Sequence, residues 1–237
     1  MDGNLIDAVN AGVGGAGGTG PALTIRDAVF LDDFQGGQLI PGVTAFARQN
    51  SPWGNIPNYG ATGNDDNLES VMHSISWRGL TGANAPRADY VLDVTPGQAY
   101  KLQVLLSENF YGSGGSIAPG NMTTRESDYL LYSGAFTEDP VGEGRTIYDQ
   151  TLNVNTLNIT GFDNGNFTGV VLTMEFTATD PQATIWARQV TSPSGAGDVA
   201  GIINGLTLEA VIPEPSSFSL LVLGLIAVRG IARTRRG

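Results

Sequence analysis

The chain has 237 residues, no cysteine, and 23 acidic against 12 basic residues. Four of the basic residues but only one acidic residue lie beyond residue 212, so residues 1–212 hold 8 basic and 22 acidic residues, a net charge of −14. This length allows one sizeable domain and a tail, the missing cysteines exclude disulfides and thiolate chemistry, and so acidic a body repels nucleic acid.

Apolar and polar residues alternate along several segments, which is typical of half-buried strands. In residues 170–178, for example, Leu172 and Met174 alternate with Thr173 and Glu175. We expect strands at residues 5–9, 23–30, 70–77, 89–94, 99–107, 128–133, 146–154, 170–178, 184–190 and 206–210. Pro96 and Gly97 predict a type II turn that joins two of them, 89–94 and 99–107, in a hairpin. No segment before residue 213 keeps a helical period over three turns, so an all-β sandwich or barrel is expected.

Two motifs of enzymes lack the context that they need. Residues 12–17 match G-x-G-x-x-G, but Gly20 and Pro21 follow where a dinucleotide-binding helix would begin, so we interpret this segment as a loop. His73 is the only histidine. It falls in the expected strand 70–77 without a G-x-S-x-G motif, so a packed or surface histidine is predicted.

Acidic residues offer two further interpretations. Glu126 and Asp128 are alternate residues of a strand and share a face, as a glycosidase pair would, although such a pair also arises by chance in an acidic chain. The turns 64–67 and 163–166 carry oxygen ligands for calcium, but they lack the EF-hand spacing. A structural calcium therefore stays open, and no cofactor is predicted.

Aromatic residues in loops suggest a sugar-binding surface. Trp53, Tyr59, Phe110 and Tyr111 lie in segments rich in Gly, Asn and Ser. Flat rings stack on the C–H faces of sugars, while neighbouring amides and carboxylates bind the hydroxyls. The alternative is that these rings cover the ends of the hydrophobic core.

Three segments resemble the malectin domain, a carbohydrate-binding β-sandwich. They are residues 7–12, which end in Asn-Ala-Gly, residues 90–108 with their turn and the Ser-Glu that ends them, and residues 203–209. The resemblance covers most of residues 4–211. It implies an antiparallel sandwich of the jelly-roll, galactose-binding type, whose adjacent aromatics Phe110 and Tyr111 contact sugar. The family's aromatic on the preceding strand falls near Met72, so this contact is either missing here or moved to Trp77, and an acidic contact falls on Asp198.

The end of the chain resembles the PEP-CTERM sorting signal of bacterial surface and exopolysaccharide-associated proteins. Pro213, Glu214 and Pro215 precede an apolar run at 220–228, and a basic stop follows at Arg229, Arg233, Arg235 and Arg236. Arginines beyond an apolar segment hold it on the cytoplasmic side of a membrane. The resemblance implies a short transmembrane helix and processing by an exosortase near Glu214.

These observations predict a malectin-like domain at 1–212 and a sorting signal at 213–237. The expected protein is exported, transiently anchored in the membrane and then located at the cell surface or in the extracellular matrix. It is expected to be a non-catalytic protein that binds a surface glycan or exopolysaccharide. An exported form implies either a start upstream of Met1 that encodes a signal peptide, which we favour, or a trimmed chain. The alternatives are an inert structural matrix protein and a glycoside hydrolase that uses Glu126 and Asp128.

Overall fold

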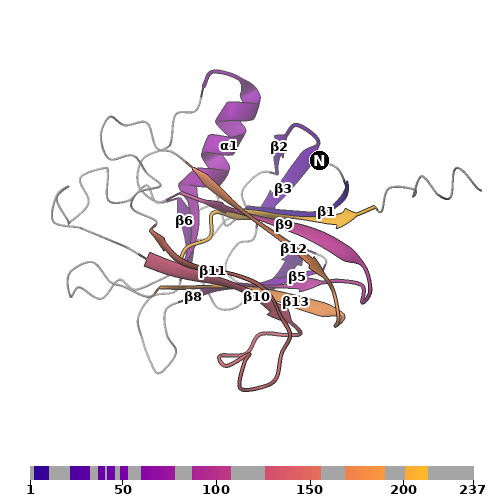
Figure 1. Ribbon diagram of the computed structural model, residues 1–237. Coiled ribbons are helices and arrows are strands. Elements are labelled where there is room, and N and C mark those ends of the chain that lie inside the picture. The colour runs from indigo at the N-terminus through magenta and orange to yellow at the C-terminus, as the bar shows by residue number, and fades with distance from the viewer. Residues whose placement is uncertain are drawn as a thin grey trace, which may run out of the picture.

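The computed structural model describes residues 3–10, 22–32, 37–40, 42–45, 49–52, 60–77, 87–107, 126–155, 169–189 and 201–212. They form two stacked six-stranded sheets, a two-stranded sheet and a helix (Figure 1). The first sheet has the order β12 (Val170–Thr177), β9 (Ala99–Leu106), β14 (Gly205–Val211), β1 (Gly3–Asn10), β3 (Ala28–Asp32) and β2 (Leu23–Ile25). The second has the order β11 (Ile147–Asn155), β10 (Glu126–Ser133), β13 (Gln182–Gln189), β8 (Arg87–Asp93), β5 (Val43–Ala45) and β4 (Gly37–Ile40).

The remaining elements are α1 (Gly63–His73) and the pair β6 (Gln49–Pro52) and β7 (Ser74–Trp77). Among the described strands, β1 and β3 form a parallel pair, and the other pairs, such as β9 with β12, are antiparallel. The expected all-β sandwich is therefore confirmed. No helix within the described residues is long and apolar enough to span a membrane.

The core lies between the two six-stranded sheets, where alternate residues of each strand face inward. Leu102 and Val104 of β9 and Tyr129 and Leu131 of β10 are fully buried there. On β12, Met174 is buried and its neighbours Thr173 and Glu175 are exposed, as the period of two predicts. Each such leucine contributes about 1.5–3 kcal/mol through its burial.

Three stacked aromatic rings close one side of the sandwich. The Tyr148 ring of β11 lies 4.9 Å from Phe176 of β12, which lies 5.4 Å from Tyr100 of β9. The Tyr148 hydroxyl accepts a hydrogen bond from the backbone N–H of Thr179 at 2.8 Å. Because β11 belongs to the second sheet and β9 and β12 to the first, this stack joins the two sheets.

The turn at residues 95–98 forms as expected, but the hairpin prediction is wrong. The N–H of Gln98 donates to the Thr95 carbonyl at 3.1 Å, and Gly97 has φ +83°. However, β8 pairs with β13 in the second sheet and β9 pairs with β12 and β14 in the first. The turn therefore carries the chain across the core from one sheet to the other, because both strands bury their apolar faces against the opposite sheet.

The strand predicted at 70–77 is also wrong for the first half of its length. Residues up to His73 belong to α1, and only the last four form β7. The helix begins with a reciprocal cap, in which the N–H of Asp65 donates to Thr62 Oγ1 at 3.3 Å and the N–H of Thr62 donates to Asp65 Oδ2 at 3.1 Å. Thr-x-x-Asp is a helix-start pattern, a local signal that is independent of helical periodicity.

The helix packs on the outer face of the first sheet, away from the main core (Figure 1). Val71 and Met72 are buried there against Phe30 and Leu105. A Cβ at Gly205 would lie 2.8 Å from Val71 Cγ1, so only glycine allows this approach. The single strand expected at 23–30 is also divided, since Arg26 takes a positive φ of 52° between β2 and β3.

Candidate functional site

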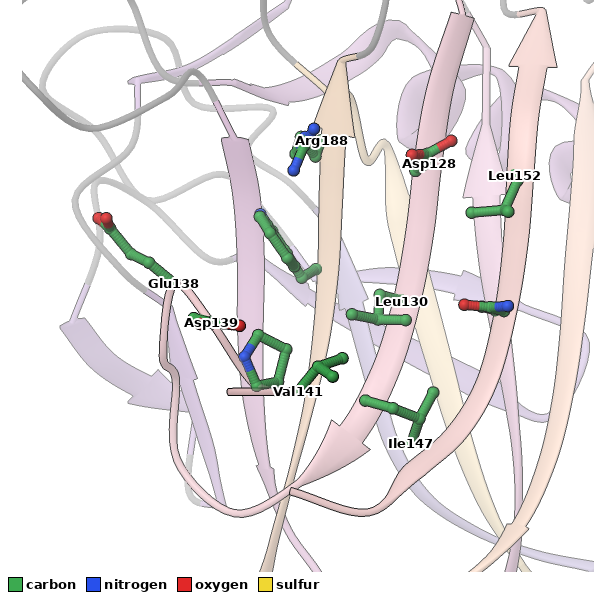
Figure 2. Close-up of a pocket in the computed structure, with 11 residues that line it drawn as sticks. Asp128, Leu130, Glu138, Asp139, Val141, Ile147, Leu152 and Arg188 are labelled. Carbon is green, nitrogen blue, oxygen red and sulfur yellow. The ribbon is translucent and has the colours of Figure 1, made fainter. Parts of the chain in front are cut away.

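A pocket of about 260 Å³ lies on the outer face of the second sheet (Figure 2). Its floor consists of side chains from β10, β11 and β13 that alternate with core residues. Tyr129 and Leu131 point into the core, so Asp128 and Leu130 between them point outward. The same alternation along β13 places Trp186 and Arg188 on the outer face.

The strand register arranges these side chains in rows across the sheet. Asp128 lies opposite Arg188, and Leu130 lies opposite both Trp186 and Gln150. In the next row, Tyr132 lies opposite Ile147. Directly opposed side chains on one face are about 4.5–5.5 Å apart at Cβ, so each row forms a continuous strip of the floor.

The segment between β10 and β11 forms one wall of the pocket through Glu138, Asp139, Pro140 and Val141. Hydrogen bonds to the sheet hold this wall. The N–H of Thr137 donates to the Tyr132 hydroxyl at 3.0 Å, and that hydroxyl donates to the Thr137 carbonyl at 3.1 Å. Thr184 Oγ1 also donates to the Gly134 carbonyl at 2.7 Å. The wall is thus built into the fold before any ligand arrives.

The pocket has a charged end and an apolar end. Figure 2 shows Asp128 and Arg188 at one end, Ile147 and Val141 at the other, and Leu130 between them. Asp128 Oδ1 accepts a hydrogen bond from the N–H of Asn153 at 2.9 Å. Because of this anchor, the carboxylate keeps its position at the charged end.

A β-bulge shapes the charged end. The pairing of β10 with β11 shifts between Ser127 and Tyr129, so that Leu152 and Asn153 together oppose Asp128. Asn153 has a positive φ of 55°, a conformation that asparagine tolerates better than most residues. Bulges redirect side chains next to binding sites, and this one leaves Leu152 exposed beside Asp128.

Trp186 is the largest side chain of the floor and is only 9% exposed. The Arg188 guanidinium carbon lies 5.9 Å from the centre of the indole, and the Phe136 ring meets the indole edge-on at 6.5 Å. The indole Nε1 is buried and has no hydrogen-bond acceptor in the described part of the chain. An indole N–H can only donate, so this atom is an unpaired donor buried beneath the surface of the pocket.

Most residues singled out from the sequence lie outside the described part of the chain. These are Trp53, Tyr59, Phe110, Tyr111 and Asp198 for sugar, and Pro213, Glu214, Pro215, Arg229, Arg233, Arg235 and Arg236 for sorting. Trp77 ends β7, and its side chain is not described. Glu126 and Asp128 do lie on one strand, and Asp128 lines the pocket.

Residues of the acidic turn 64–67 attach α1 to the first sheet, and His73 ends this helix. His73 is the last residue of α1, which corrects its placement in a strand. Asn64 Oδ1 accepts from the N–H of Arg26 at 3.0 Å, and Asn67 Nδ2 donates to the Thr24 carbonyl at 2.6 Å. These residues thus attach α1 to β2 and β3. Across the described ranges no three His, Cys, Asp or Glu side chains gather in a metal-binding group, and the turn 163–166 lies outside those ranges.

Two carboxylates approach each other where β1 of the first sheet passes the end of β8 of the second. Burial, and then the negative charge of Asp93, raise the pKa of Asp7 above its usual 3.8. Gly42 lies between them, since a Cβ there would be 3.9 Å from both Asp7 Oδ2 and Asp93 Cβ. Asp93 Oδ1 accepts a hydrogen bond from Gln182 Nε2 at 3.2 Å. For Asp7, burial disfavours the charged form of the carboxylate.

No protein-family model matches the chain, and no curated protein matches its sequence significantly. Solved structures with the same fold include the ANXUR2 extracellular domain from Arabidopsis thaliana, which is 12% identical with a TM-score of 0.51 over 89% of this chain and 49% of that one. The plant receptor-like kinase ANX1 is 10% identical with a TM-score of 0.54 over 87% of this chain and 48% of that one. The chain thus spans about half the length of these proteins. At such identities the likeness is one of fold alone.

Proposed function

We propose that this protein is a non-catalytic carbohydrate-binding module of the bacterial surface or extracellular matrix. The observation that carries the proposal is the pocket on the second sheet, in which an indole and aliphatic side chains lie beside a carboxylate, a guanidinium and an amide. Sugars combine apolar C–H faces with hydroxyls that both donate and accept, and this set of side chains matches both properties. The volume, about 260 Å³, suits one or two sugar residues rather than a large ligand.

The proposed binding mode follows from the chemistry of each end. Asp128 accepts hydrogen bonds from sugar hydroxyls, and Arg188 donates to hydroxyl oxygens. Gln150 can do both. Leu130 and the exposed part of Trp186 contact the C–H face. Since the strands and the anchored wall hold these groups in advance, little conformational entropy is lost on binding.

The loop aromatics offer a second surface for the same glycan. By the malectin resemblance, Phe110 and Tyr111 would contact sugar, with Trp77 and Asp198 as further contacts. The loop aromatics Trp53 and Tyr59 are candidates for the same surface from the sequence alone. Alanine at Phe110 and Tyr111 should then weaken glycan binding, and each exposed ring should contribute about 1–3 kcal/mol. Unchanged affinity in the double variant would restrict binding to the pocket on the second sheet.

The location outside the cytoplasm rests on the tail. Pro213, Glu214 and Pro215 with the arginines that follow would direct the chain to an exosortase and hold it briefly in the membrane. The acidic, cysteine-free body is compatible with such a location, and the ANXUR2 structure is by its name an extracellular domain. Deleting residues 213–237 should abolish surface retention, as measured by cell fractionation. Normal retention of the truncated protein would contradict the sorting proposal.

Binding of the full chain to a glycan array, followed by titration calorimetry, tests the main proposal. We expect Asp128→Asn and Arg188→Gln to weaken binding by about 1.5–3 kcal/mol each, because each removes hydrogen bonds to a charged group. Glu175→Gln, an exposed change on β12 of the other sheet, is the matched control and should bind normally. Retention of no glycan would favour the inert matrix protein. Release of sugars from a polysaccharide would favour the hydrolase.

A further inference from the structure

We propose that the pocket on the second sheet selects an acetylated sugar, with the acetyl group at the apolar end. This inference rests on the proposed carbohydrate-binding function and adds the chemical class of the ligand. N-acetyl and O-acetyl groups share the chemistry that matters here, since each carries one carbonyl oxygen and one methyl group. Three features of the pocket support the inference.

The first feature is the separation of charge from apolar surface. Asp128, Leu130 and Tyr132 are alternate residues of β10, so the row of Asp128 and the row of Ile147 are about 13 Å apart at roughly 3.3 Å per residue. Hydroxyls therefore find charged partners on the floor at the row of Asp128 and Arg188 and an amide at Gln150 in the next row, while the row of Ile147 offers none. A ligand that filled the pocket with hydroxyls alone would place some of them against Ile147 and Val141, where they would lose hydrogen bonds to water without replacement.

The second feature is the exposure of the apolar end. Val141 is 72% exposed although it projects from an anchored wall, and Ile147 is half-buried. A methyl group seated between Val141, Ile147 and Leu130 would remove all three from water, which is favourable in proportion to the apolar area covered. An acetyl methyl reaches beyond the sugar ring and can enter this end while the ring stays near Asp128.

The third feature is the unused donor between the two ends. Trp186 shares its row with Leu130, and within the described residues its buried Nε1 has no acceptor. A buried donor without a partner is uncommon, and a shift of the indole that let a ligand oxygen reach this atom would gain a hydrogen bond without displacing an existing one. The carbonyl oxygen of an acetyl group is a strong acceptor adjacent to the methyl group. One acetyl group could thus supply a carbonyl oxygen to the donor and a methyl group to the apolar end.

The test compares sugars that differ only in acetylation. The full chain is titrated with a panel of N-acetylated oligosaccharides and with O-acetylated polysaccharides, each beside its deacetylated twin, by calorimetry and tryptophan fluorescence. We expect the preferred acetylated ligand to bind about ten- to hundredfold more tightly than its twin, the usual effect of one apolar group in a pocket. The N-acetylated and O-acetylated arms show which linkage the pocket takes.

Two variants assign the preference to the pocket. Val141→Ser should reduce it, while Val171→Ser, an exposed valine on β12 of the other sheet, should leave it unchanged. Trp186→Phe keeps an aromatic ring but removes the N–H, so it should also reduce the preference, with a melting curve to confirm that the protein is folded. Binding without preference for acetyl groups, or a preference that survives Val141→Ser, would overturn this inference alone. Failure to bind any sugar would overturn the proposed function as well.

Discussion

Asn204 and Ser107 form a pair of hydrogen bonds that joins the end of β9 to the start of β14, its neighbour in the first sheet. The N–H of Ser107 donates to Asn204 Oδ1 at 2.6 Å, and Asn204 Nδ2 donates to the Ser107 carbonyl at 2.9 Å. The same Nδ2 donates to the Met72 carbonyl at 2.8 Å near the end of α1. Asn204 therefore connects the end of β9, the start of β14 and the helix. This gives Asn204 of segment 203–209 a structural role.

Asn204→Ala should lower the free energy of unfolding by about 2–4 kcal/mol. The substitution removes the two hydrogen bonds that the Asn204 side chain makes with the buried backbone of Ser107, and losing the partner of a buried polar group costs about 1–3 kcal/mol. Urea denaturation measures the change. Asn4→Ala on the exposed face of β1 is the control and should stay within about 0.5 kcal/mol of the natural protein. An equally small effect of Asn204→Ala would show that water replaces the amide without cost.

Phe176→Ala should destabilise the protein by about 3–5 kcal/mol, the usual cost of truncating a buried phenylalanine. The ring stacks between Tyr148 and Tyr100 and thereby joins the two sheets. Phe176→Leu should cost less, because it keeps much of the apolar volume. Thermal unfolding followed by circular dichroism gives both values. If the leucine variant lost as much stability as the alanine variant, ring stacking rather than volume would hold this side together.

Asp7→Asn should stabilise the protein at neutral pH. The raised pKa of Asp7 means that the folded state holds its proton more tightly than the unfolded state. Stability therefore falls as the pH rises from the unfolded value of about 3.8 through the raised pKa. The asparagine variant lacks this penalty, so its advantage should be full above the raised pKa and absent well below 3.8.

The control for this effect is Asp93→Asn, which removes the repulsion but leaves Asp7 buried. Since burial is the larger cause of the raised pKa, this variant should gain less stability than Asp7→Asn. Unfolding curves from pH 3 to pH 8 compare the three proteins. Parallel curves for Asp7→Asn and the natural protein would mean that Asp7 titrates alike in both states.

The sequence predicted the strands that bury one face and expose the other. On β12, every second side chain turns to the core, so the period of two is visible in the residues themselves. It could not show which strands pair. The turn at Gly97 would suit a hairpin within one sheet as well as the observed crossing between two. The choice depends on distant strands, because β8 finds its partner in β13 and β9 finds its partners in β12 and β14.

The pocket was harder to predict than the fold. Asp128 was identified as half of a carboxylate pair, whereas the structure places it opposite Arg188 and beside Trp186. The sequence held one signal for the pocket, a tryptophan at an outward position of β13 between the inward residues Ile185 and Ala187. The pocket wall could not be foreseen, since its position depends on the hydrogen bonds between Tyr132 and Thr137, which local periodicity does not encode.

Substitutions at Asn153 test whether the β-bulge supports the pocket. Asn153→Ala should destabilise the protein by about 1 kcal/mol, since alanine tolerates its φ of 55° less well than asparagine does. Asn153→Gly should be at least as stable as the natural protein, because glycine has no Cβ. Both variants keep the N–H that donates to Asp128 Oδ1. If the bulge positions Asp128 and Leu152, the glycine variant should bind glycan normally and the alanine variant more weakly. Urea denaturation and calorimetric titration of the same samples separate the two effects, and equal stability and affinity in all three proteins would show that the left-handed backbone has no part in shaping the site.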